Sequence, residues 1–216
     1  MGRYWDSVPR ATPFLARLLE KVMDRHPPIT DWQRCQLQFH FDLLVKWNKR
    51  INLTRIEGLE DVVVRHYWES IALGDLLPFR KIRIMDVGSG GGFPGVVLAI
   101  TRPDAYLYLV ESDARKAAFL REATQELPNC QVLKFRVEVL EQGVDWVVSR
   151  GIRWEITRGA AERLADNVAY MTTTEGVREI TGKWPIRWSD PVPLPSGGDR
   201  VILLGKLLSA DHDGLG

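Results

Sequence analysis

An apolar stretch runs directly into a cluster of glycines at residues 84–95, which read IMDVGSGGGFPG. Because glycine has no Cβ atom, it adopts positive φ readily and lets backbone N–H groups approach a ligand closely. The first turn of a helix adds further N–H groups that favour negative or polar ligand atoms. Residues 90–95 also fit the pattern G-x-G-x-x-G, which in this setting predicts a strand, a ligand-binding turn and then a helix.

Residues 79–207 alternate between strand-like and helix-like segments. Strands are expected at 82–87, 105–110, 132–135, 146–148, 168–172, near 186 and at 201–204. Helices are expected from 95, over 114–127 and over 157–166. This alternation is typical of βαβ units, so we expect an α/β fold with a mainly parallel, Rossmann-like sheet.

The first 78 residues show only helical periodicity, with helices expected over 11–24, from 30 to about 47, and from 59. Thr30 followed three residues later by Gln33 matches a capping box and marks the start of the second helix. We therefore expect an N-terminal helical cap over 1–78, a ligand-binding domain over 79–207 and a tail over 208–216.

Overall charge and cysteine content narrow the functional classes. The formal net charge is only +1, which excludes a protein held to nucleic acid by bulk charge alone. Two isolated cysteines, Cys35 and Cys130, predict neither a disulfide framework nor a zinc site, so no metal is expected. With no secretory or membrane-spanning segment in the sequence, we expect a cytoplasmic protein with no membrane partner, and a monomer.

Two acidic residues indicate which cofactor the glycine turn binds. Glu111 lies at the end of the next expected strand, where a carboxylate can accept hydrogen bonds from ribose hydroxyls. Asp86 immediately precedes the first glycine, and an acid there suits the cationic amino-acid end of S-adenosylmethionine better than a pyrophosphate. The residues favour S-adenosylmethionine, with Gly88 and Gly90 at the turn, and leave a dinucleotide-dependent oxidoreductase as the alternative.

Several short motifs, taken in order, resemble the bacterial 16S rRNA guanine-N7 methyltransferase G family, first called glucose-inhibited division protein B. They are Lys46-Trp47-Asn48-Lys49, Asn52-Leu53-Thr54, Arg65-His66, the glycine run, Arg136-Val137-Glu138, Asp145-x-Val147-x-Ser149-Arg150, and a basic last strand with Arg200 and Lys206. The resemblance implies a class I methyltransferase sheet, S-adenosylmethionine as cofactor, and methylation of N7 of a guanosine in small-subunit rRNA. The partner would be 16S rRNA or the assembling small ribosomal subunit.

The resemblance also assigns cofactor contacts, and these fall on Gly88, Phe93, Glu111, Val137, Glu138 and Arg150. Arg150 ends the fourth expected strand, where open α/β sheets bind ligands, so we predict that it is the catalytic residue. The match breaks between 151 and 185, where the family's usual Lys-Gly pair is absent. A methyltransferase-like protein that binds cofactor and RNA without activity is therefore a second alternative.

Basic residues gather around the first motif. Residues 31–56 hold five Lys or Arg against two Asp, with aromatic residues interleaved. A solvated helix face would look similar, but with the resemblance we predict phosphate contacts to RNA. The predicted RNA-contacting residues are Lys46, Lys49, Arg50, Asn52, His66, Arg200 and Lys206. A buried histidine between the two parts of the chain is the alternative interpretation of His66.

Overall fold

The structure is a computed structural model that describes residues 12–24, 27–55 and 58–208. Its centre is an eight-stranded sheet in the order β3-β2-β1-β4-β5-β8-β6, with β7 paired to β8. The five parallel strands are β1 (Ile82–Val87), β2 (Ala105–Val110), β3 (Cys130–Leu133), β4 (Val144–Arg150) and β5 (Ala165–Thr173). The antiparallel strands are β6 (Ile186–Trp188), β7 (Val192–Pro193) and β8 (Arg200–Leu207).

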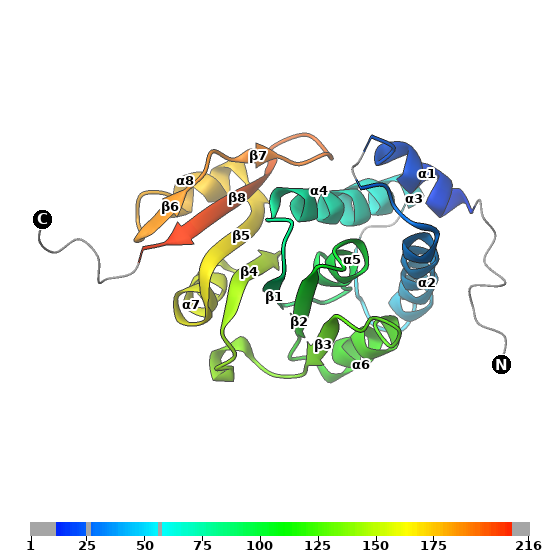
Figure 1. The fold of residues 1–216 in the computed structure, drawn as a ribbon, viewed down its shortest axis with the longest axis horizontal. Helices are drawn as coiled ribbons and strands as arrows, with labels where there is room; N and C mark the ends of the chain where they lie inside the picture. Colours follow the sequence, from blue (N-terminus) through cyan, green and yellow to red (C-terminus); the bar gives the residue numbers. More distant parts are fainter. Residues whose placement is uncertain (1–11, 25–26, 56–57, 209–216) are drawn as a thin grey trace, which may run out of the picture.

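Helices cover both faces of this sheet (Figure 1). The strands alternate, so that Ile84 packs with the larger hydrophobic cluster on one face and Met85 with the smaller cluster on the other. The larger cluster contains residues of α5 (Gly95–Thr101) and α6 (Ala114–Ala123), and the smaller one those of α7 (Trp154–Leu164) and α8 (Thr174–Ile180). A parallel sheet buried on both faces confirms the predicted Rossmann-like α/β fold.

The N-terminal helices pack on the face that carries α5 (Figure 1). They are α1 (Pro13–Lys21), α2 (Asp31–Asn48), α3 (Leu59–Val62), the π-helical η2 (Val63–Trp68) and α4 (Glu69–Leu76). The capping box at the start of α2 is confirmed: the Thr30 hydroxyl accepts from the Gln33 backbone, and the Gln33 side chain accepts from the Thr30 backbone. A π-helical turn is rare and frequently occurs at functional sites.

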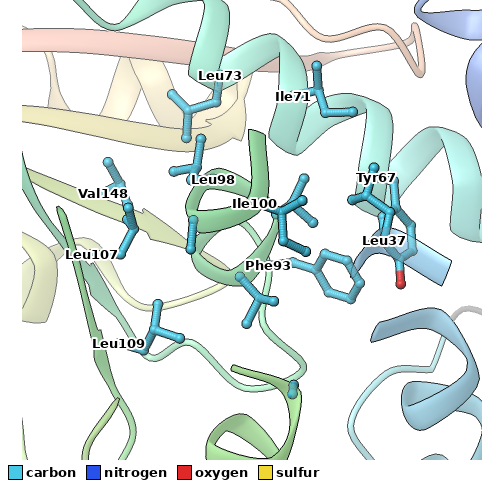
Figure 2. Packing of buried hydrophobic residues seen from close by; sticks show 14 of the residues in the cluster. Leu37, Tyr67, Ile71, Leu73, Phe93, Leu98, Ile100, Leu107, Leu109 and Val148 are labelled. Atoms are coloured by element: carbon cyan, nitrogen blue, oxygen red, sulfur yellow. The ribbon is translucent and has the colours of Figure 1, made fainter. Parts of the chain in front are cut away.

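One hydrophobic cluster joins these helices to the sheet. Figure 2 shows Leu37 of α2 and Tyr67 of η2 beside Phe93, and Leu98 of α5 between these residues and Leu107 of β2. All five belong to the same cluster, as does Ile71 of α4. The predicted boundary at residue 78 is therefore a change of secondary structure within a shared core. The cap is thereby joined to the sheet through one continuous core.

Some elements differ from the sequence prediction. The strand expected at 132–135 lies at Cys130–Leu133, and the side chain of Phe135 is exposed. The helix expected at 157–166 begins at Trp154 and ends at Leu164, and β5 follows without a loop. Helix α8 was not predicted, because it buries only one of its residues and so has almost no apolar periodicity. Residues 1–11 of the predicted cap and residues 209–216 of the predicted tail lie outside the described residues.

Candidate functional site

A cavity of about 390 Å³ opens at the carboxyl edge of the parallel strands. Six predicted cofactor residues line it: Gly88, Gly90, Glu111, Val137, Glu138 and Arg150. Six further lining residues were not predicted from the sequence: Ser112, Lys116, Phe135, Arg136, Ile152 and Ile156. These residues follow strands β2, β3 and β4. Their position after the end of a strand was the only feature of the sequence that could have assigned them to the cavity.

The first glycine of the turn is required by its conformation and its neighbours. Gly88 has φ +76°, and its N–H donates to the Val110 carbonyl at 2.9 Å. A Cβ atom built on Gly88 would overlap the side chain of Ile152, which lines the same cavity. A larger residue would thus have to displace part of the cavity wall and adopt a strained backbone conformation.

Glu111 connects the end of β2 to the glycine turn. Its Oε2 accepts from the Gly90 N–H at 3.1 Å, and its Oε1 accepts from the Asp113 N–H at 2.8 Å. Each carboxylate oxygen can accept a second hydrogen bond. Glu111 therefore has a fixed position at the cavity and unused capacity for a hydroxyl-bearing ligand.

Asp86 does not line the cavity, although the sequence analysis assigned it to the cofactor. Its side chain is completely buried, and Oδ2 accepts from the N–H of Gly95 at 3.0 Å, at the start of α5. Burial raises the pKa of this carboxyl to about 7, and its Oδ1 has no hydrogen-bond partner. The structure thus places Asp86 under the turn, where it holds the first turn of α5 against β1.

Val137 and Glu138 belong to the short 3₁₀ helix η3 (Val137–Val139), and an arginine from α7 holds them in place. The guanidinium of Arg163 donates to the carbonyls of Val137 at 2.7 Å, Glu138 at 3.0 Å and Leu140 at 2.8 Å. Arg163 was not predicted, because nothing in the sequence distinguishes it from any arginine in the last turn of a helix.

Arg150 enters the site with a partner from the helical cap. Its Nη2 lies 3.7 Å from Oε2 of Glu69, a fully buried carboxylate at the start of α4. Arg200 donates to the same carboxylate, from Nε to Oε1 at 3.0 Å and from Nη2 to Oε2 at 2.8 Å. Burial lowers the pKa of Arg150 to about 10, against the opposing effect of Glu69, so Arg150 stays protonated at neutral pH.

Phe93 of the glycine turn packs against His66 of the cap. Their rings stack with centroids 4.4 Å apart, and neither residue lines the cavity. His66 Nε2 lies 2.7 Å from the hydroxyl of Thr54, and its buried Nδ1 has no partner. Burial, with a smaller contribution from Arg150, lowers the pKa of His66 to about 3, so the ring is neutral. The structure therefore shows the buried histidine of the alternative interpretation.

Three predicted RNA-contacting residues form an exposed basic group at the carboxyl end of α2. We call this group the α2 basic patch; it consists of Lys46, Lys49 and Arg50. The exposed Asn52 lies in the following loop, which Asn48 orders by accepting from the backbone N–H groups of Leu53 and Thr54.

The structure separates the two basic residues of β8. Arg200 pairs with Thr173 at the carboxyl end of β5, whereas Lys206 pairs with Asn167 near its beginning. Six residues of extended strand span about 20 Å. Lys206 is therefore not part of the same surface as Arg200, and Arg200 itself is engaged by Glu69.

The described part of the chain contains neither a membrane-spanning helix nor a cluster of metal-binding side chains. No helix there has the length and apolar character needed to cross a membrane. Among the same residues, no group of three or more His, Cys, Asp or Glu side chains is arranged to hold a metal ion.

The known sequences that this chain resembles carry the same family description. A family model described as rRNA small subunit methyltransferase G matches residues 33–167. The ribosomal RNA small subunit methyltransferase G of Azoarcus sp. (strain BH72) is 33% identical over 207 residues, covering 89% of this chain and 96% of that protein. The protein of the same name from Paracoccus denitrificans (strain Pd 1222) is 43% identical over 109 residues, which are 50% of this chain and 56% of that protein.

Solved structures show the same fold at low sequence identity. A SAM-dependent methyltransferase from Aquifex aeolicus superposes with a TM-score of 0.56 at 14% identity, covering 73% of this chain and 97% of that one. A TehB-like SAM-dependent methyltransferase from Corynebacterium glutamicum gives a TM-score of 0.52 at 14% identity, covering 80% and 100%. At such identities the likeness concerns the fold alone.

Proposed function

The chain belongs to the rRNA small subunit methyltransferase G family, and we propose that it transfers a methyl group from S-adenosylmethionine to N7 of a guanosine in 16S rRNA. The observation that carries the proposal is the cavity at the carboxyl edge of the sheet, where Gly88, Glu111 and Arg150 converge. This is the edge at which open α/β sheets bind their ligands.

The cavity residues fit S-adenosylmethionine in size and chemistry. A volume of about 390 Å³ is within the range of cofactor sites. Glu111 retains acceptor capacity for ribose hydroxyls, and the walls from Val137 and Glu138 suit a planar base. Arg150 brings a protonated guanidinium to the cavity wall, and that charge suits a carboxylate or a phosphate.

When bound, the cofactor supplies an electrophilic methyl group on a sulfonium. Guanine N7 already carries a lone pair on the major-groove edge of the base, so no protein base is needed to remove a proton first. The work left to the protein is to hold the two reactants in line and close together. Arg150 at the cavity provides a rigid, charged fork for that purpose.

Substrate RNA would contact the α2 basic patch. The patch lies at the end of α2, and the loop that follows approaches the glycine turn, where the Leu53 carbonyl would lie 3.5 Å from a Cβ built on Gly91. Asn52 is the additional polar group on this surface. We place the reaction in the cytoplasm, on 16S rRNA or an assembling small subunit, with the enzyme as a monomer.

The alternatives are not favoured. The family match concerns a methyltransferase, which argues against a dinucleotide-dependent oxidoreductase. The segment after residue 150, where the resemblance breaks, folds into α7, β5 and α8 as part of the sheet and leaves Arg150 at the cavity. An inactive binding protein therefore has no support from this segment.

Mass spectrometric mapping of 16S rRNA from cells with and without the gene tests the proposal. We expect one guanosine to lose its N7 methyl group in the deleted strain. Purified protein with S-adenosylmethionine should restore that group on rRNA or subunits from the deleted strain. An unchanged modification map, together with no transfer in vitro, would overturn the proposal.

A further inference from the structure

Glu69 is a buried carboxylate shared by two arginines from distant parts of the chain. It begins α4, directly after the π-helical turn, and its side chain is fully buried. Arg200 makes a two-point contact at 3.0 and 2.8 Å, while Arg150 approaches Oε2 at 3.7 Å. The first contact joins the cap to β8, and the second joins it to the end of β4.

The charges in this cluster do not balance. Taking a carboxylate out of water is costly, but one arginine in a two-point contact already neutralises it. The second arginine adds a positive charge, and the nearby ring of His66 is neutral. One arginine would be enough to stabilise the buried carboxylate, so stability alone does not account for the second one.

The hydrogen bonds of Arg150 are also incomplete. Its Nη2 faces Glu69, while its buried Nη1 has no partner. Buried polar atoms are nearly always paired, and an exception calls for an explanation such as a missing ligand. Arg150 also lines the cavity, so the guanidinium that Glu69 contacts belongs to the wall of the candidate ligand site.

We propose that Glu69 is a positioning residue for methyl transfer, which orients Arg150 from the helical cap so that its guanidinium serves the bound cofactor and substrate. This role rests on the proposed function. Through Glu69 the cap both covers the sheet and sets the geometry at the reaction centre. Arg200 completes the anchor by donating to both oxygens of the same carboxylate.

A double-mutant cycle tests the role, because residues that act through one another give non-additive effects. The variants are Glu69→Gln, Arg150→Ala and the two combined. Titration calorimetry measures S-adenosylmethionine affinity, and transfer to 16S rRNA measures kcat and KM. We expect Glu69→Gln to weaken cofactor binding several-fold and to lower kcat about 10- to 100-fold, the size of effect that misplacement of a reacting group produces. In the Arg150→Ala background, Glu69→Gln should have almost no further effect.

A control is the pair of buried Arg102 and half-buried Asp104 at the amino-terminal edge of β2, joined by contacts of 2.9 and 2.7 Å. Asp104→Asn should lower the melting temperature but leave cofactor affinity and kcat unchanged. If Glu69→Gln does not fold, Glu69→Asp takes its place in the cycle, because it keeps the charge and shortens the reach.

Additive losses in the cycle, or a folded Glu69 variant with normal affinity and kcat, would overturn the positioning role. A wild-type protein that binds S-adenosylmethionine but methylates no rRNA would instead refute the proposed function. In that case the cycle in cofactor affinity still decides the role of Glu69, with non-additivity supporting it and additivity refuting it.

Discussion

The buried carboxyl of Asp86 makes the stability of this protein depend on pH in an unusual direction. Asp86 is completely buried, accepts one backbone hydrogen bond from Gly95 and has a second oxygen without a partner. Asp86→Asn keeps the size and the acceptor but removes the titration. Comparing the two proteins at each pH therefore isolates the cost of ionising this group.

The magnitude follows from the pKa. Burial raises the pKa of Asp86 from 3.8 to about 7 in the folded state, whereas the unfolded chain keeps the ordinary value. Between about pH 4 and 7 the folded protein thus binds one more proton than the unfolded chain, and its unfolding free energy falls as pH rises. At about 1.4 kcal/mol per unit, three units give a loss of about 4 kcal/mol.

The buried histidines act in the opposite direction. Burial lowers the pKa of His40 to about 4 and that of His66 to about 3, so their contribution to stability rises with pH up to about 6.5. Both histidines are present in wild type and in Asp86→Asn, so their contribution cancels in the difference between the two proteins.

Urea denaturation, repeated in steps of about one unit from about pH 4.5 to 8.5, gives the unfolding free energy of each protein. We expect wild type to lose stability relative to Asp86→Asn across this range and to level off above pH 8. A difference that stays constant with pH would refute the reasoning, because it would mean that Asp86 is ionised in the folded state at all these pH values.

The other predictions concern the site. Arg150→Ala should slow methyl transfer by orders of magnitude without a new titrating limb in the pH–rate profile. Arg150→Lys should restore only part of the rate, since the point charge of lysine does not reproduce the planar fork of arginine. Near-normal turnover of a folded Arg150→Ala protein would count against the assignment. Glu111→Ala should weaken S-adenosylmethionine binding by roughly 1–3 kcal/mol in calorimetry, and an unchanged affinity would remove Glu111 from the site. Arg163→Ala should also weaken cofactor binding, because two carbonyls of η3 and that of Leu140 lose their donor. Equal affinity would show that η3 holds its shape unaided. Alanine at all three positions of the α2 basic patch should reduce the salt dependence of RNA binding while cofactor affinity stays constant, and an unchanged salt slope would make the patch an ordinary solvated surface.

Local signals in the sequence predicted most of the fold. The apolar strand before Gly88 and the helix after Pro94 were predicted from neighbours along the chain, and both are present. The capping box at Thr30 likewise depends on residues only three apart. Helix α8 was missed for the same reason, because its few buried contacts leave no apolar repeat to detect.

The cavity was predicted in part. Parallel strands bring their carboxyl ends to one edge, so residues that follow β1, β2 and β4 had to lie close together, and Gly88, Glu111 and Arg150 do. Phe93 and Asp86 also lie near the carboxyl end of β1 in the sequence, but their side chains are buried in the core. The direction of each side chain depends on which helices cover that face, and this information is absent from the strand pattern.

Only the tertiary structure decided the partners of the charged groups. Glu69 and Arg200 are 131 positions apart, and Arg163 reaches a loop about 25 residues before it. The alternation of strands and helices and the glycine turn arise from backbone sterics and hydrophobic periodicity, which act over a few residues and can be read along the chain. Buried charge pairs form only where packing brings distant elements together, and a carboxylate such as Glu69 looks like any surface acid until the fold has enclosed it.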